Sequence, residues 1–354
     1  MYREGVMRWA YGAVLGLLAG FPAAGWTQVS VLTIVDGETS VERSDKVALT
    51  PLGAFQREPL ESGLDLAFGD ELSSTATGMA VVLMCAEVDG ESEFTLPSPF
   101  RVVLIPTTSG QGCALSLQGG AADVVAGTDT EIRSGEVTLG SQRTQYGVVV
   151  SRSDNRMARE AYVFEGAVRV SGGEQRPVRL KAGHRLALSR AYTARPVALE
   201  RKDIRRAAHL YAKVDASRTK LKGQAWKQSY RELTALHTAV LSQPDKVEPR
   251  VNLAVARLNL DVKAPSTVQY LIQAQTMNTA NTALLARTAM VKGMVYQELG
   301  KTDAAQMEFR VAASIDPQVS KEKVADVYKI SPRLLQRIQV PVDGMRAPVP
   351  VRPQ

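Results

Sequence analysis

The residues that most often carry enzymatic or metal chemistry are few in this 354-residue chain. It has three histidines, His184, His209 and His237, and two cysteines, Cys85 and Cys113. We expect His184 in a β-turn and the other two histidines on different helices, so their spacing fits neither a metal-binding pair nor a Ser/His/Asp arrangement. Two cysteines without a nearby histidine cannot complete a closed zinc site. The sequence therefore predicts no catalytic residue, no metal site and no cofactor.

Four acidic residues are the remaining candidates for hydrolytic chemistry. Glu160 and Glu165 flank an expected strand, and Asp123 and Asp129 follow the glycine pair at 119–120. Paired carboxylates hydrolyse glycosides when they are correctly spaced in three dimensions, but solvated turns produce the same pattern. No Gly-Lys-Ser/Thr follows the glycine pair, so it is not a phosphate-binding loop. We expect a protein that is not an enzyme.

The two cysteines have two possible states. In an exported protein Cys85 and Cys113 can form a disulfide, which loop entropy makes worth about 3–4 kcal/mol. The alternative is two buried thiols that never meet. The sequence leaves both states open.

The second half of the chain begins with a basic stretch. Between residues 201 and 222 there are only two acids, Asp203 and Asp215. The basic residues of this stretch are Arg201, Lys202, Arg205, Arg206, Lys213, Arg218, Lys220 and Lys222. Such a field attracts a polyanion by steering and counterion release. For an exported protein this favours lipopolysaccharide, an anionic cell-wall polymer or an acidic protein over nucleic acid; the alternative is a solvated helix face.

Composition supports two folded parts of opposite charge. A hydrophobic content of 45% with 22% charged residues is typical of a globular protein, and the length allows two domains. Residues 27–190 carry a net charge of −6 and residues 191–354 a net charge of +12, within a total of +7. The asymmetry suggests an anionic partner for the second part.

The N-terminus has the features of an export signal. Arg3 and Arg8 precede an uncharged apolar run over 9–21, and residues 23–25 are small. We therefore expect a signal peptide over residues 1–25 and a periplasmic or otherwise exported protein. The alternative is an uncleaved N-terminal anchor, which would be the chain's contact with a membrane.

Residues 29–192 have the pattern of an all-β domain. Short runs of Val, Ile, Leu and Thr alternate with turn residues, which favours an antiparallel sandwich, a barrel or a β-solenoid-like fold. The expected strands include 29–35, 80–84, 100–105, 114–117, 122–125, 148–151, 161–164 and 167–170.

Residues 198–340 have the pattern of paired helices. Glycine becomes scarce and apolar residues recur at spacings of three and four. Consecutive hairpins of this length stack into a short α-solenoid, and the tail over 341–354 is proline-rich and predicted to be disordered. The expected helices are 204–214, 226–240, 251–260, 268–277, 284–299 and 303–315, with one capping helix over 324–338.

Over about residues 60–190 the β region contains five characteristic segments in order: 69–73 (GDELS), 78–84 with Asp89 and Gly90, 115–125 around Gly119 and Gly120, 163–170 (VFEGAVRV) and 180–186 (LKAGHRL). Taken together, these segments resemble the FecR domain, a periplasmic β-rich module. The resemblance implies the β fold and an extracytoplasmic sensing or binding role. Residues 147–149 lack the Thr and Phe of the family's R-G-T-x-F segment, and only residues 1–8 precede the apolar run. The family's sigma-factor regulation is therefore not expected here.

Residues 286–317 have the spacing of one helical hairpin. Small residues let two antiparallel helices approach, aromatic residues fill the space beside them, and a proline ends the second helix. These residues are Gly293, Tyr296, Gly300, Ala305, Phe309, Ala312 and Pro317. Their pattern resembles one repeat of the tetratricopeptide family. Ala289 and Lys292 replace the usual Trp and Leu of the first helix. A second, degenerate repeat is expected just before this one.

Together these features predict a binding protein. We expect an exported, non-enzymatic scaffold or sensing protein of the bacterial envelope whose partner is a protein or an anionic envelope polymer. The concave face of the helical array is expected to hold a peptide or helix, with Asn252, Arg257, Arg287 and Gln297 exposed there. Two alternatives remain: an envelope enzyme acting on glycans and a membrane-anchored signalling protein of the FecR type.

Overall fold

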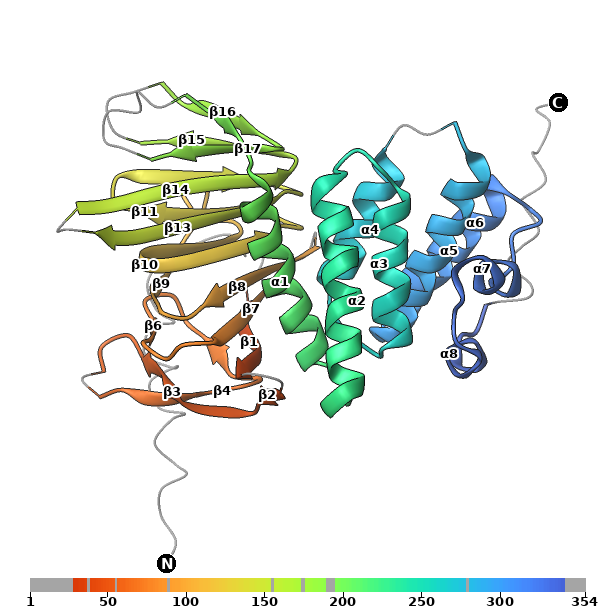
Figure 1. Ribbon diagram of the computed structural model, residues 1–354, viewed down its shortest axis with the longest axis horizontal. Coiled ribbons are helices and arrows are strands. Elements are labelled where there is room, and N and C mark those ends of the chain that lie inside the picture. The colour runs from red at the N-terminus through yellow and green to blue at the C-terminus, as the bar shows by residue number, and fades with distance from the viewer. Residues whose placement is uncertain are drawn as a thin grey trace, which may run out of the picture.

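The structure is a computed structural model that describes residues 28–36, 39–54, 56–87, 90–153, 156–172, 176–188, 195–277 and 280–340 (Figure 1). A β-rich part comes first and a helical part follows, which confirms the order predicted from the sequence. The predicted signal peptide (1–25) and the proline-rich tail (341–354) lie outside the described residues. Within the described residues no helix has the length and hydropathy needed to cross a membrane.

The β part consists of short strands joined mostly by tight turns. The strands are β1 Gln28–Asp36, β2 Thr39–Val41, β3 Arg43–Thr50, β4 Glu58–Glu61, β5 Asp65–Leu66, β6 Glu71–Ser74, β7 Met79–Glu87, β8 Gly90–Pro97, β9 Phe100–Pro106, β10 Cys113–Val125, β11 Thr130–Ser134, β12 Val137–Ser141, β13 Gln145–Ser153, β14 Arg156–Glu165, β15 Ala167–Ser171, β16 Val178–Lys181, β17 His184–Ala187 and β18 Val197–Ala198. The last strand lies beyond residue 192, the predicted end of the β domain, and pairs with β17.

The strands form two sheets that share β10. Sheet A runs β1-β7-β8-β10-β13-β14-β17-β18, with β2 and β5 also paired to β1. Sheet B runs β4-β3-β6-β9-β10-β11-β12-β15-β16. Among the described pairings only β10 with β11 is parallel.

Alternating side chains from the two sheets fill the core between them. In β9, for example, Phe100, Val102 and Leu104 are buried while Arg101 is exposed, the period-two pattern of a strand with one face in the core. The core continues through Leu83, Leu96 and other apolar residues of both sheets.

The sequence predicted two strands, 114–117 and 122–125, where the structure has the single strand β10. The strand changes sheets near its middle, where its register with β9 shifts between Leu117 and Gly119. Gly120 there has φ of 88°, and a Cβ at this position would lie 2.2 Å from the Pro99 carbonyl oxygen. Only glycine allows this bend, so a turn signal in the sequence proved to be a bend inside one strand.

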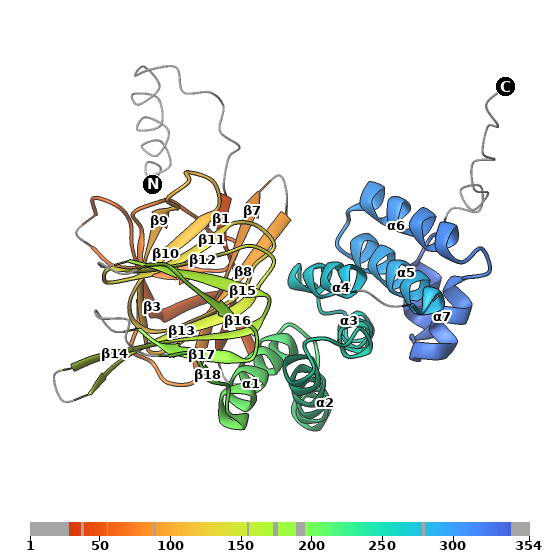
Figure 2. The same ribbon diagram turned by 90° about the horizontal axis from the view of Figure 1, so that it is seen from above.

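Eight helices follow in the described part of the chain, arranged mostly as antiparallel pairs. They are α1 Arg201–Ser217, α2 Gly223–Ser242, α3 Glu248–Asn259, α4 Ser266–Thr276, α5 Thr282–Glu298, α6 Thr302–Ile315, α7 Lys321–Tyr328 and α8 Pro332–Arg337. The two views agree that α5 to α8 lie farthest from the β part (Figures 1 and 2). The predicted single helix over 324–338 is wrong: Lys329 has φ of 58°, and Ser331 with Pro332 starts a new helix.

Close packing within the α5–α6 pair follows from its small residues. Ala305, Phe309 and Ala312 form the buried stripe of α6. A Cβ at Gly293 of α5 would lie 2.4 Å from the Phe309 ring. The ring therefore occupies the space that a side chain at 293 would need.

Helix α1 covers the outer face of sheet A and joins the two parts of the chain. Tyr162 and Phe164 of β14 pack against Ala207 and Tyr211 of α1. A second apolar cluster joins α1 to the first strands of sheet A. Its members are Val214 of α1, Val35 of β1, and Ala80 and Val82 of β7. The molecule thus has three layers along this direction, namely sheet B, sheet A and the helices.

Candidate binding site

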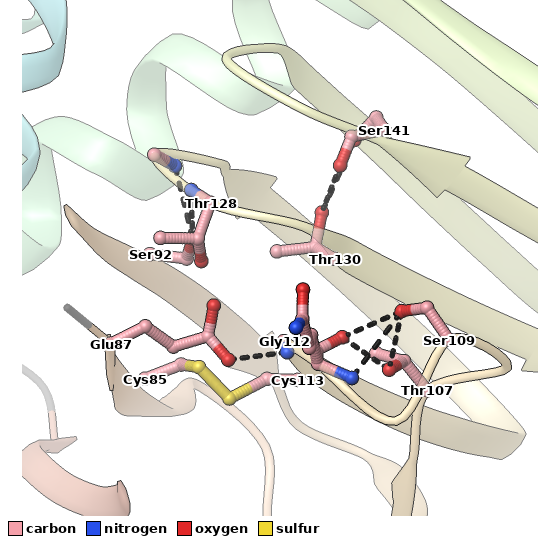
Figure 3. The surroundings of a disulfide bond; sticks show 12 residues. Cys85, Glu87, Ser92, Thr107, Ser109, Gly112, Cys113, Thr128, Thr130 and Ser141 are labelled. Atoms are coloured by element: carbon pink, nitrogen blue, oxygen red, sulfur yellow. Dashed lines mark hydrogen bonds between the residues drawn. A yellow bond between two sulfur atoms is a disulfide. The ribbon is translucent and has the colours of Figure 1, made fainter. Parts of the chain in front are cut away.

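A disulfide joins the two sheets of the β part (Figure 3). Cys85 of β7 belongs to sheet A, and Cys113 begins β10 where that strand pairs in sheet B. Their Cα atoms are 6.2 Å apart, and both side chains are buried. The Gly112 N–H donates to Glu87 beside the bond. Of the two states that the sequence left open, the structure has the disulfide.

The β part contains a groove of about 590 Å³. It lies where β10 changes sheets, and four segments far apart in the sequence form its walls: the β8–β9 turn, the bend of β10, β13 and the start of β14. The lining residues are Pro97, Ser98, Pro99, Gln118, Gly119, Gly120, Ala121, Val149, Val150, Ser151 and Met157.

Among the residues whose side chains the structure describes, the lining of this groove has no ionisable group and is mostly apolar. Met157 is 45% exposed, and Val149 and Ala121 are half-buried on neighbouring strands. A Cβ at Gly119 would meet no atom within 4 Å, so the groove floor is open at that residue. The polar groups are the Ser and Gln side chains and the backbone. Such a surface suits an uncharged ligand held by apolar contact and a few hydrogen bonds.

Sequence reasoning missed this groove. The glycine pair at 119–120 was noticed, but only as a loop near Asp123 and Asp129. No local pattern links it to the Pro97–Pro99 turn or to Met157, because folding alone brings these segments together. Met157 is a single large apolar residue near Arg156 and Arg159 at the start of β14, and one such residue does not predict a site.

The acidic residues considered for glycoside hydrolysis are engaged elsewhere. Glu160 accepts a hydrogen bond from the Tyr162 hydroxyl, and Glu165 Oε1 lies 2.7 Å from Arg250 Nη2. Asp123 is buried under α1, whereas Asp129 is half-buried in the β10–β11 turn. None of the four lines the groove.

The three histidines lie apart from one another. His184 Nδ1 is 2.9 Å from the Ala182 carbonyl oxygen, and His209 shares a hydrogen bond of 2.9 Å with the Tyr230 hydroxyl. His237 is wholly buried against Asp215. In the part of the chain that the structure describes, no group of three or more His, Cys, Asp or Glu side chains is placed to hold a metal ion.

Arg257 belongs to a buried ionic cluster, so its predicted exposure is wrong. Its Nε and the His237 ring each lie 2.8 Å from Asp215 Oδ2, and its Nη1 donates to Ser266 and Thr267. Burial alone would raise the pKa of Asp215, but Arg257 and His237 together hold it well below its usual range. Burial lowers the pKa of His237, with Asp215 opposing that effect. The cluster ties α1, α2, α3 and α4 together.

The other predicted partner-binding residues differ in exposure. Asn252 is exposed on α3. Arg287 is half-buried and hydrogen-bonds to Tyr328 of α7, and the Gln297 side-chain oxygen accepts from the Gln339 N–H at 3.1 Å. Helix α7 and the segment that follows α8 thus contact two of these side chains. A binding role for Asn252, Arg287 and Gln297 stays a prediction.

The predicted basic cluster divides into exposed and internal residues. Lys213 donates to the Gly78 carbonyl oxygen, and the Arg218 side chain is buried 3.8 Å from Glu93. The exposed members are Arg201, Lys202, Arg205, Arg206, Lys220 and Lys222. The structure therefore presents six of the eight cations to solvent.

Polar contacts hold the helical part against the β part. Glu93 of β8 accepts from the Ser266 N–H at 3.1 Å, and Gln145 of β13 donates to the Tyr270 hydroxyl at 3.2 Å. Farther along, Lys301 before α6 donates to Glu91 at 2.8 Å. These contacts fix the position of the helices relative to the groove-bearing sheet.

Comparison with known proteins adds no identity. No protein-family model and no curated protein matches this sequence.

Proposed function

We propose that this chain is an exported, non-enzymatic binding or scaffold protein of the bacterial envelope whose β part holds a short extended segment of a partner protein. The observation that carries the proposal is the uncharged groove where β10 changes sheets. Its volume of about 590 Å³ falls in the range of pockets that enclose a ligand, roughly 300–1,000 Å³. Its described lining offers apolar contact and hydrogen bonds and contains no acid or base that could act on a bound ligand.

The export signal, the FecR-like β part and the tetratricopeptide-like helical part belong to this proposal. The two-sheet β part and the Gly293–Phe309 contact in α5–α6 are consistent with those resemblances. The buried contacts across sheet A support a scaffold role, because they keep the two parts in one arrangement.

The exposed basic residues favour an anionic envelope polymer as a second ligand. The first turns of α1 carry Arg201, Lys202 and Arg205, and the α1–α2 turn carries Lys220 and Lys222. Charge of one sign attracts polyanions in a salt-dependent way. This binding would use a surface separate from the groove.

Gly119 permits a sharp test of the groove. Its backbone lies outside the left-handed region and its Cβ position is open, so Gly119→Leu adds a side chain to the groove without strain. Met157→Lys places a charge at the same site. Met307→Lys is the matched control, because Met307 is 66% exposed on α6, far from the groove.

The assay selects displayed peptides on the wild-type protein and measures their Kd by fluorescence polarisation. We expect uncharged apolar peptides, and we expect Gly119→Leu and Met157→Lys to weaken their binding by at least about tenfold, or 1.4 kcal/mol. Met307→Lys should bind as the wild type does. Failure to select any peptide, or selection of peptides that bind the Gly119→Leu variant equally well, would contradict the proposal.

A further inference from the structure

The buried carboxylate of Asp123, at the boundary between the β part and the helical part, differs from the other buried carboxylates there. Each of the others has a cation or a hydrogen-bond donor as a partner. Glu165 faces Arg250, Asp215 faces Arg257 and His237, and Glu93 accepts from the Ser266 N–H. Asp123 is only 4% exposed, and among the described residues its Oδ1 has no hydrogen-bond partner. A buried polar atom without a partner costs free energy, and a buried charge costs more.

The position of Asp123 explains its isolation. It lies on the outer face of sheet A in a cross-strand row with Thr95, Gly147 and Tyr162, under helix α1. A Cβ at Gly147 would lie 2.5 Å from Asp123 Oδ1. The carboxylate therefore occupies the space beside Gly147, and at this position β13 supplies no donor side chain. On the other side, no hydrogen bond from Thr95 of β8 reaches Oδ1.

The charged groups around Asp123 do not neutralise it by contact. Arg206 and Tyr211 of α1 interact electrostatically with Asp123, and Tyr162 of β14 lies in the same cross-strand row, next to Arg185 of β17. The ionisable residues beyond Tyr211 and Thr95 line one small pocket with them: Glu93, Asp215, Arg257 and Tyr270. Arg218 lies 3.8 Å from Glu93. Arg206 is the cation whose field reaches Asp123, but it is exposed, with its guanidinium 4.8 Å from the centre of the Tyr162 ring. Arg185 pairs with Glu200 instead.

Burial raises the pKa of Asp123 to about 6, and Arg206 offsets only part of this effect. Near pH 5 the folded protein therefore carries a neutral carboxyl at this point. At neutral pH it carries a buried anion.

We propose that Asp123 makes the docking of α1, and with it the helical part, on sheet A pH-dependent. Docking is tight while the carboxyl is protonated, because a neutral group without a partner is tolerated more easily than a charge. After ionisation, the charge favours conformations in which α1 lifts from the sheet and water reaches the carboxylate. Asp123 lies in β10, the strand whose residues 118–121 line the groove. The residue that controls the docking of α1 therefore lies close in sequence to the proposed binding site.

The direction and size of the effect follow from proton linkage. The pKa of Asp123 is higher in the docked state, about 6, than the ordinary value of 3.8 expected when α1 is undocked. The docked state therefore binds more protons, and docking weakens as pH rises from about 4 to about 6. Between pH 5.0 and 7.5 these two values give a change in the docking equilibrium of about tenfold.

Hydrogen exchange of the α1 amides (Arg201–Ser217) measures the docking. Opening constants, corrected for intrinsic exchange, are compared at pH 5.0 and 7.5 in the full chain. We expect the wild-type constant to increase about tenfold and that of Asp123→Asn, which is neutral at both pH values, to stay unchanged. Glu232→Gln, on the exposed face of α2, is the control and should behave as the wild type does.

Two further measurements keep the proposal testable if Asp123→Asn folds poorly. Carbon NMR of the wild-type carboxyl should give a pKa near 6 for Asp123, and Arg206→Gln should raise it further. Equal α1 opening at both pH values in the wild type, the same pH dependence in Asp123→Asn, or a carboxyl that titrates near pH 4 would each overturn the proposal. None of these experiments needs a ligand, so the result is independent of the groove.

Discussion

Replacing Arg250 by methionine tests the buried ion pair that joins the end of β14 to helix α3. The Arg250 side chain is fully buried, with Nη2 2.7 Å from Glu165 Oε1. Its guanidinium also donates to the carbonyl oxygens of Lys246 at 2.6 Å and Pro244 at 2.9 Å. Arg250→Met retains much of the apolar stem but removes the charge and all three contacts.

The size of the loss in unfolding free energy depends on how the Glu165 carboxylate is left in the variant. Without Arg250, the Glu165 carboxylate keeps only the Gln273 amide, which donates to both carboxylate oxygens at 3.2 and 2.9 Å when its nitrogen is turned toward Glu165. Removing one partner of a buried ion pair costs about 3–5 kcal/mol. We expect a loss of this size in the free energy of unfolding at pH 8.

The same variant has a predicted pH dependence. Burial raises the pKa of Glu165 in the wild type, and Arg250 opposes this effect. Without Arg250 the folded-state pKa of Glu165 rises further, so the folded variant binds a proton that the unfolded chain releases. A raised folded pKa stabilises at low pH and loses that contribution as pH rises. The cost of Arg250→Met should therefore be smaller at pH 5 than at pH 8.

Urea denaturation followed by circular dichroism measures these differences at both pH values. Glu165→Gln combined with Arg250→Met should be more stable than Arg250→Met alone at pH 8, because no buried charge is left. The reasoning is refuted if Arg250→Met costs less than about 1 kcal/mol at pH 8, as an exposed pair would. It is also refuted if the double variant is as unstable as the single one.

Two further predictions concern the covalent link and helix packing. Cys85→Ala with Cys113→Ala, which opens a link across 28 residues, should lower the free energy of unfolding by about 3–4 kcal/mol in urea titrations; an unchanged midpoint would contradict it. Gly293→Ala should lower the stability by about 1–3 kcal/mol despite alanine's better helix propensity, because its Cβ would lie 2.4 Å from the Phe309 ring. Gly119→Ala, where the Cβ position is open, is the control in thermal melts.

Local pattern predicted most helices and many strands, because the burial of one face leaves a period in the sequence. The stripe of Ala305, Phe309 and Ala312 in α6 is an example. The pattern failed where backbone geometry decided the outcome. Lys329 adopts a left-handed conformation that divides α7 from α8, and Gly120 bends β10 without ending it.

The groove and the buried ionic cluster could not be predicted from the local sequence pattern. Arg257 reads as a solvent-facing helix residue, yet it is buried because Asp215, 42 residues earlier, offers it a carboxylate. The groove needs Pro97, Gly119 and Met157 at one place. Neither the Arg257–Asp215 ion pair nor the meeting of the groove segments produces a periodic pattern or a motif in the sequence.

The sequence by itself determined the order of a β part and a helical part, the charge asymmetry between them and most element positions, since these depend on composition and on contacts between near neighbours. Only the tertiary structure decided which polar residues are buried, that Cys85 meets Cys113, and that Asp123 Oδ1 finds no hydrogen-bond donor under α1 in the described part of the chain. The physical reason is that burial and ion pairing depend on which distant segment covers a residue, and in this chain the covering segment is often a helix from the other part.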